Sequence, residues 1–309
     1  MARKKTHYAH TLMMAVFLPL AGCGGSGSSG DATGYLSLGI SDAPVHEAEK
    51  VCISFDEIEF KGTGDPLVVS LDPPEKVNLL DFQGNNAAPI LFREELPAGN
   101  YQWMRLGVDA VQGTSGGAGD TGGAGCDGEG SYIVMNDGNV YNLYVPSGAQ
   151  TGLKLVGGFT VPANGTADFT AEFDLMKSIT SPPGALPDVT LRPTIRLVNN
   201  IDVGALTGEV AAELATAENC APSVYVFDDG VVPNAIDTGD VADPEDPVAT
   251  AMVNEHTNDA AMPIYDYTVG FLLAGDYEAA FTCDGETFEP AGGKNVTIAE
   301  QQLTTVNFP

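Results

Sequence analysis

The stretch VCISFDEIEF, residues 51–60, decides the fold class. Its apolar and polar residues alternate, which places Val51, Ile53 and Phe55 on one face of an extended strand. Beyond Phe55 the alternation changes phase, as it does at a β-bulge, where one strand carries an extra residue. The stretch therefore predicts a β-strand with a buried face and an irregularity near its centre.

Similar short segments continue on both sides of this stretch, separated by Gly, Pro, Asn and Asp. We expect strands at residues 35–40, 77–82, 90–92, 103–111, 132–145, 152–161, 167–175 and 189–198. Short strands at this spacing are typical of antiparallel sandwiches and barrels. Residues 113–130 (GTSGGAGDTGGAGCDGEG) interrupt the pattern, and there we expect a long flexible hairpin loop.

The character of the chain changes near residues 199–204, and beyond them Lys294 is the only Lys or Arg. Further strands are expected at residues 206–210, 224–227, 265–273, 276–283 and 296–308. They predict a second, smaller and acidic sandwich of about seven strands. LPAGNY (96–101) and LLAGDY (272–277) share the form Leu-x-Ala-Gly-(Asn/Asp)-Tyr. This form predicts a tight turn, after which the tyrosine begins the next strand with its ring inward.

The first residues carry the three parts of an export signal. A positive segment (Arg3 to Lys5) precedes ten mostly apolar residues, TLMMAVFLPL (11–20). This is about half of the ~20 residues that a helix needs to cross a bilayer. Together with small residues at the cleavage site, the pattern is typical of a secretory signal. LAGC (20–23) resembles the bacterial lipobox, which implies cleavage after residue 22 and lipidation of Cys23. The alternative is an ordinary signal peptide with a chance cysteine at the cut.

Residues 24–30 (GGSGSSG) have the composition of a flexible tether, so we assign residues 23–33 to the lipidated cysteine and its linker. Stable anchoring takes more than one hydrophobic signal, and the lipoprotein resemblance implies two or three acyl chains. Lipoproteins with Asp after the cysteine stay at the inner membrane. Gly24 at this position implies delivery to the outer membrane of a Gram-negative cell, facing the periplasm or the cell surface.

The chain is strongly acidic, with 13 Lys and Arg against 42 Asp and Glu. Three of the basic residues and none of the acidic ones lie in residues 1–22, so the mature chain has 10 against 42, a formal net charge of −32. A surface of this charge repels nucleic acid and anionic lipid head groups, which makes both poor partners. The hydrophobic content of 43% still provides enough apolar material for folded cores.

The five cysteines fit an exported protein with structural disulfides. Lipidation of Cys23 leaves four, and four cysteines allow three connectivities. If the boundary near residue 204 is correct, the pairs that stay within one domain are Cys52–Cys126 and Cys220–Cys283. An oxidising compartment lets such bonds form. No C-x-x-C motif occurs in the sequence, which disfavours a redox or zinc role.

Several segments resemble the bacterial family called domain of unknown function 4382, over about residues 34–200. They are GYLSLGISDAP (34–44), FDEI (55–58), LPAGNY (96–101), QTGLKL (150–155), FDLMKS (173–178) and LRPT (191–194). The family occurs in predicted bacterial lipoproteins and has no established activity. LTGEV (206–210) and LLAGDY (272–277) more loosely resemble the carboxypeptidase-regulatory, transthyretin-like sandwiches, which are non-catalytic. We therefore assign residues 34–203 and 204–309 to two all-β sandwich domains.

The sequence contains no recognised catalytic pattern. It has no G-x-S-x-G elbow, P-loop, Rossmann glycine pattern or H-E-x-x-H. The two mature histidines, His46 and His256, are interpreted as solvated loop residues. We expect no catalytic residue and no enzyme activity.

A divalent cation is the best candidate ligand. Seven acidic residues of the segment 228–246 lie among Gly and Pro, and calcium prefers many oxygen ligands on a curved loop. Asp228, Asp237, Asp240 and Asp243 are the candidate ligands, but the spacing is not that of an EF-hand. A solvated acidic loop without metal is the expected state, and a calcium site is the alternative. Weaker candidates, Asp120, Asp127 and Glu129, lie in the Gly-rich segment.

A second cluster has charges of both signs near expected strands. Its members are Asp174, Lys177, Arg192 and Arg196, and a structural ion-pair cluster is the expected state, with a polar ligand site as the alternative.

These observations predict a membrane-anchored, non-catalytic envelope lipoprotein that acts as a binding or structural module. Its expected partners are the membrane, through the anchor, and an envelope protein or a glycan. The alternative is a calcium-dependent glycan-binding or glycan-processing accessory lipoprotein. Such a protein would need exposed aromatic rings to bind sugars. The rings available for this are the single tryptophan, Trp103, and ten tyrosines, most of them at expected strand positions.

Overall fold

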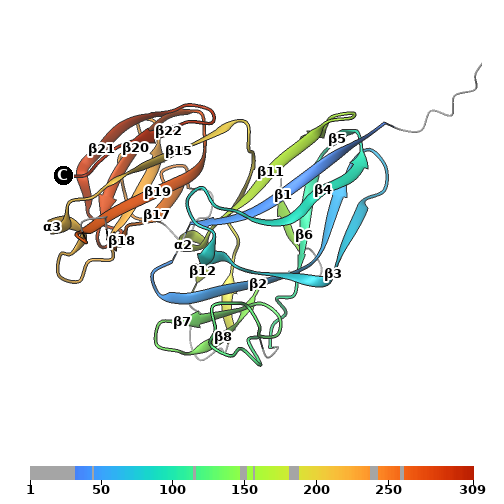
Figure 1. The fold of residues 1–309 in the computed structure, drawn as a ribbon, viewed down its shortest axis with the longest axis horizontal. Helices are drawn as coiled ribbons and strands as arrows, with labels where there is room; N and C mark the ends of the chain where they lie inside the picture. Colours follow the sequence, from blue (N-terminus) through green and yellow to red (C-terminus); the bar gives the residue numbers. More distant parts are fainter. Residues whose placement is uncertain are drawn as a thin grey trace, which may run out of the picture. The chain divides into compact units, whose positions relative to one another are not determined.

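β-Strands carry almost all of the regular structure (Figure 1). The structure is a computed structural model that describes residues 32–43, 45–113, 116–146, 152–155, 157–180, 188–236, 243–257 and 261–309. Cys23 and the signal segment lie outside these residues, as do Asp237 and Asp240. Within the described residues, no helix is long and apolar enough to cross a membrane.

Two sheets enclose the larger core. The first has the order β14-β11-β1-β4. Its strands are β1 (Thr33–Ala43), β4 (Ala88–Pro97), β11 (Thr166–Asp174) and β14 (Ile195–Asn199). The second has the order β12-β13-β8-β7-β2-β6-β9, and β3 also pairs with β2. Its strands are β2 (Ala48–Lys61), β3 (Leu67–Asn78), β6 (Trp103–Val108), β7 (Tyr132–Met135), β8 (Val140–Tyr144), β9 (Leu153–Leu155), β12 (Ile179–Thr180) and β13 (Asp188–Leu191).

Apolar side chains from both sheets form one continuous core, as in a sandwich. Leu36, Leu38 and Ile40 of β1 are buried in it, and Phe55 of β2 meets Phe173 of β11 with ring centroids 6.5 Å apart. The short strands β5 (Gly99–Tyr101) and β10 (Phe159–Val161) pair with each other beside this core. The all-β sandwich predicted for this part of the chain is confirmed.

The irregularity predicted in residues 51–60 is a β-bulge. The pairing of β2 with both β3 and β6 shifts register between Phe55 and Glu57. Because of this shift, Ile58 and Phe60 remain fully buried although they are out of phase with Ile53.

The remaining sheets come from residues 203–305. One has the order β18-β19-β15-β22 and the other β17-β16-β20-β21. Their strands are β15 (Val203–Glu209), β16 (Ser223–Asp228), β17 (Ala249–Met252), β18 (Asn254–Thr257), β19 (Pro263–Leu273), β20 (Gly275–Thr282), β21 (Phe288–Ile298) and β22 (Leu303–Thr305). Leu206 and Val269 of the first sheet share a buried core with Val224 and Ala279 of the second.

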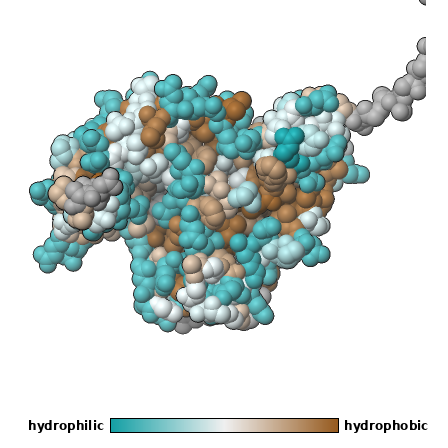
Figure 2. All heavy atoms as spheres, viewed as in Figure 1, coloured by the Kyte–Doolittle hydropathy of each residue, from teal (hydrophilic) through white to brown (hydrophobic). Residues whose placement is uncertain are grey.

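Helices are short and few in the described residues. They are η1 (Leu79–Asp81), α2 (Leu175–Ser178) and α3 (Ala212–Ala215). Figure 2 shows hydrophilic residues over much of the face in view, with apolar residues gathered over β4 and β6.

Three strand pairings differ from a purely antiparallel arrangement. β1 pairs with β11, β8 with β13, and β15 with β22, each in parallel. Parallel neighbours need long crossover connections. The paired strands β1 and β11, for example, lie more than a hundred residues apart in the chain. Alternation within a strand carries no information about such distant partners.

The two Leu-x-Ala-Gly-(Asn/Asp)-Tyr segments lead from one sheet into another. Tyr101 and Tyr277 are both buried, as predicted. The Tyr101 hydroxyl donates to the carbonyl of Pro97 at 2.8 Å, and the Tyr277 hydroxyl donates to that of Leu273 at 2.9 Å. Each tyrosine therefore closes the turn between itself and the carbonyl four residues before it. The turns are crossovers rather than hairpins, because β4 does not pair with β5, nor β19 with β20.

No strand pairing in the described residues joins a strand of 33–199 to one of 203–305. Residues 32–309 nevertheless form one compact unit by their contacts. The division into two domains at residues 203 and 204 stays a prediction.

Candidate functional site

Two disulfides fix the ends of long segments. Cys52–Cys126 joins the Gly-rich segment to β2, with Cα atoms 5.7 Å apart. Cys220–Cys283 joins the segment before β16 to the end of β20, with Cα atoms 4.4 Å apart. These are the pairs that the sequence analysis favoured. Disulfides of this kind are typical of proteins outside the reducing cytosol.

The Gly-rich segment is not the hairpin loop expected for residues 113–130. Its flanking strands β6 and β7 both pair with β2 and not with each other. The Lys50 ammonium, buried beneath the segment, donates to both Asp120 carboxylate oxygens at 2.9 Å and to the Gly123 carbonyl at 2.8 Å. Asp127 accepts from the Thr121 hydroxyl. Asp120 therefore pairs with an internal cation, the Lys50 ammonium.

The acidic segment 228–246 is described only in part. Asp243 accepts a hydrogen bond from the Glu245 amide at 2.8 Å, as in a local turn, and Asp228 is exposed at the end of β16. The described residues contain no group of three or more His, Cys, Asp or Glu that could hold a metal ion. Because Asp237 and Asp240 lie outside the described residues, the calcium hypothesis stays a prediction.

The interpretation of both histidines as solvated loop residues needs correction. His46 is half-buried rather than solvated, and its Nε2 lies 2.7 Å from the Ser223 hydroxyl. Burial lowers the pKa of His46. His256 is exposed, as expected, but it lies on the strand β18 rather than in a loop, with Nε2 3.4 Å from an Asp266 carboxylate oxygen.

The predicted charge cluster is an ion-pair cluster around a small cavity. Glu172 and Arg196 face each other on paired strands and form an ion pair. Lys177 donates to the Pro247 carbonyl, and its ammonium lies 3.7 Å from Asp246. The cavity has a volume of about 140 Å³. Arg192 is exposed and does not line it.

Burial dominates the titration of the two carboxyl groups at this cavity. It raises the pKa of Glu172 to about 7, although Arg196 favours the charged form. It raises the pKa of Asp174 to about 6, against the attraction of Lys177. Asp174 also caps α2, because its Oδ1 accepts from the Lys177 amide at 3.2 Å. These contacts hold the segment 172–178 in place and fit a structural role.

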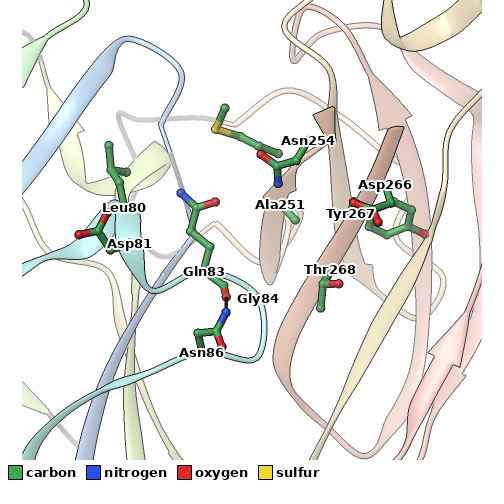
Figure 3. A pocket seen from close by; sticks show the side chains of 11 residues that line it. Leu80, Asp81, Gln83, Gly84, Asn86, Ala251, Asn254, Asp266, Tyr267 and Thr268 are labelled. Atoms are coloured by element: carbon green, nitrogen blue, oxygen red, sulfur yellow. Dashed lines mark hydrogen bonds between the residues drawn. The ribbon is translucent and has the colours of Figure 1, made fainter. Parts of the chain in front are cut away.

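A larger polar cavity lies beside η1, with a volume of about 280 Å³ (Figure 3). One side comes from the loop at residues 80–86 and the other from β17, β18 and β19. The lining residues are Leu80, Asp81, Gln83, Gly84, Asn86, Ala251, Met252, Asn254, Asp266, Tyr267 and Thr268. They offer carboxylates, amides and a hydroxyl, and none of them is Lys, Arg, His or Cys. This combination can hold a ligand by hydrogen bonds.

Alternation along β19 explains which side chains reach the polar cavity. Tyr267 points into the core, where its hydroxyl donates to the Val306 carbonyl at 2.7 Å. Its neighbours Asp266 and Thr268 therefore project from the opposite face of the strand, toward the cavity (Figure 3). Sequence reasoning identified none of the polar lining residues, because they come from two distant segments and carry no motif.

Comparison with known proteins gives one sequence family and several distant structures. The family described as "Domain of unknown function (DUF4382)" matches residues 33–193, just over half of the chain. No curated protein matches the chain.

Among solved structures, GBS52, the minor pilin of Streptococcus agalactiae, is 10% identical. The match covers 88% of this chain and 94% of that one, with a TM-score of 0.20. The fimbrial anchor protein Mfa2 of Porphyromonas gingivalis is also 10% identical, with coverage of 85% and 82% and a TM-score of 0.17. TM-scores this low do not establish a common fold.

Proposed function

We propose that this chain, which belongs to the DUF4382 family over residues 33–193, is an exported, lipid-anchored and non-catalytic envelope protein that acts by binding. The family carries no activity in its description, so the proposal depends on the residues of this chain. Two features support it independently, the export and anchoring signals on one side and the polar cavity on the other.

Export is supported by the disulfides and by the N-terminal sequence. Both disulfides join cysteines separated by more than sixty residues in the chain. The chain-entropy model assigns about 4 kcal/mol of stability to the closure of each such loop. A fold that depends on this contribution suits an oxidising compartment. The LAGC sequence at residues 20–23 and the glycine and serine residues after it support a lipid anchor on Cys23.

The polar cavity is the observation that carries binding. Carboxylates, amides and a hydroxyl line it, and its lining has none of the histidine, cysteine or lysine side chains that most often serve as nucleophile or general base. A site of this composition can select a ligand by hydrogen bonding. One side is a loop and the other consists of strands, so the loop at residues 80–86 has to stay docked on β19 for the site to exist.

The anchor is tested by fatty-acid labelling of cells that produce the full chain. We expect the label to enter the wild-type protein, which sediments with the outer-membrane fraction. Cys23→Ser should abolish both labelling and sedimentation, whereas Ser29→Ala, in the same tether, should change neither. Labelling that persists in Cys23→Ser would contradict the anchor.

The second candidate function is the calcium-dependent glycan-binding accessory. The hydrogen-bonding lining of the polar cavity favours its glycan part, because sugar hydroxyls are recognised by such groups. Its calcium part depends on the acidic segment around Asp240. Sugar retention that disappears with a chelator would favour this candidate over a calcium-independent binding protein.

A further inference from the structure

We propose that the polar cavity beside η1 is a binding site for a neutral saccharide unit, and that it works without a metal ion. The inference rests on the proposed binding function and specifies its ligand class.

Unused hydrogen-bonding groups are the first argument. Within the described residues, the side-chain amides of Gln83 and Asn254 have no hydrogen-bond partner in the protein, although the Gln83 backbone carbonyl accepts from Asn86 at 3.2 Å. In Figure 3 the Gln83 amide extends from the loop toward Asn254 on the opposite side. An amide both donates and accepts, as a sugar hydroxyl does. Two facing amides therefore suit a ligand that presents adjacent hydroxyl groups.

The position of the carboxylates is the second argument. Asp81 and Asp266 lie on opposite sides of the cavity in Figure 3, and so they do not converge on one point as metal ligands would. Separated carboxylates can each accept a hydrogen bond from a different hydroxyl of one ligand. Leu80 and Met252 add apolar surface against which the C–H groups of a sugar ring can pack.

Charge disfavours an anionic sugar as the ligand. No Lys or Arg lines the cavity, and the whole chain has a formal net charge of −29. An anionic sugar would meet two carboxylates, and apart from the exposed His256 beside Asp266 no cationic side chain described at the cavity offsets them, so repulsion disfavours it. The volume of about 280 Å³ suits a small unit rather than a long oligosaccharide.

The backbone shows that the cavity is a fixed feature of the fold. A Cβ atom on Gly270 would lie 2.0 Å from the Gly84 carbonyl oxygen, so only glycine allows the loop to approach β19 this closely. The adjoining Phe271 has φ of 53°, a left-handed conformation that is unfavourable for an aromatic residue. It lies in a register shift between β15 and β19. This irregularity lies where the loop at residues 80–86 packs against β19, and it therefore helps to determine the shape of the cavity.

The expected affinity is weak. No exposed aromatic ring lines the cavity, because the Tyr267 ring is buried in the core. Without ring stacking, a few hydrogen bonds should give a dissociation constant on the order of 1 mM. Loss of one neutral hydrogen bond should weaken binding about fivefold.

Saturation-transfer NMR on the full chain in detergent tests the proposal. The probes are glucose, galactose, mannose and N-acetylglucosamine, each with and without chelator, and glucuronate as the anionic comparison. We expect at least one neutral sugar to bind, no effect of chelator, and no binding of glucuronate. Gln83→Ala and Asn254→Ala should each weaken binding about fivefold, and Gln102→Ala, an exposed amide on the crossover after β5, should leave it unchanged.

Three results would overturn the inference: no binding of any neutral sugar, binding abolished by chelator, or binding unaffected by both Gln83→Ala and Asn254→Ala. Thermal unfolding of each variant shows whether it is folded. Failure of this experiment with lipid labelling of Cys23 intact would remove the saccharide site and leave the anchored envelope protein in place.

Discussion

Replacement of Lys50 by Met should destabilise the packing of the Gly-rich segment against the second sheet. The Lys50 and Asp120 side chains are 4% and 5% exposed, so their ion pair is buried. The ammonium also donates to the Gly123 carbonyl at 2.8 Å. Met keeps most of the length of the side chain but leaves a buried carboxylate and a carbonyl without their donor. Breaking a buried ion pair on one side typically costs about 3–5 kcal/mol.

A second change, at Asp120, provides the control for Lys50→Met. Burial alone would raise its pKa, but hydrogen bonds from Lys50 and Tyr132 lower it overall, so the carboxylate is charged in the folded protein. The double variant Lys50→Met with Asp120→Asn removes both charges and should recover part of the loss. The Cys52–Cys126 disulfide holds the segment near β2, which limits how far the carboxylate can escape into water.

Chemical denaturation of the oxidised protein measures the free energy of unfolding of each variant. We expect Lys50→Met to lose about 3 kcal/mol or more, and the double variant to be the more stable of the two. A loss below about 1 kcal/mol for Lys50→Met would mean that the pair contributes as little as a surface ion pair. The assignment of Lys50 as the internal cation of the segment would then be wrong.

Three further changes test other parts of the fold. Burial raises the pKa values of Glu172 and Asp174 to about 7 and about 6, so the folded state holds extra protons and these groups stabilise the fold at low pH. Their contribution should be lost as the pH rises from about 4 to 7, and denaturation of Asp174→Asn across this range should give a flatter profile. Gly270→Ala should destabilise the fold by about 1–3 kcal/mol through the clash with the facing loop. Gly292→Ala, where an added Cβ meets nothing within 4 Å, should leave the melting temperature nearly unchanged. Cys220→Ala should lower the free energy of unfolding by about 4 kcal/mol, and equal stability of the wild type with and without reductant would contradict this.

Local sequence patterns predicted the features that depend on a single strand or turn. The phase change after Phe55 is the β-bulge of β2, and the tyrosines of the two repeated segments are buried against their own turns. Each of these features arises within about ten residues, where alternation and turn chemistry determine the structure. The strand β3 was mostly missed, because its residues 67–76 are largely exposed and include two prolines.

Features formed by distant segments could not be predicted in this way. The polar cavity requires residues 80–86 to lie on β19, which begins at Pro263, more than 170 residues further along the chain. The contact depends on Gly84 and Gly270, which in the sequence look like ordinary loop and strand glycines. Likewise, nothing in the sequence distinguishes Lys50 from the other charged residues. Its burial beneath Asp120 depends on the fold of the distant Gly-rich segment. Pairing of distant residues, rather than local propensity, created these sites.

Lipid anchoring can be tested on the N-terminus of the protein extracted from membranes. We expect a mature chain that begins at Cys23, with the terminal peptide heavier than its sequence by the mass of the added acyl groups. Mass spectrometry of that peptide after proteolysis provides the measurement. An unmodified peptide, or a chain that begins at any other residue, would contradict the claim that this is a lipid-anchored envelope protein.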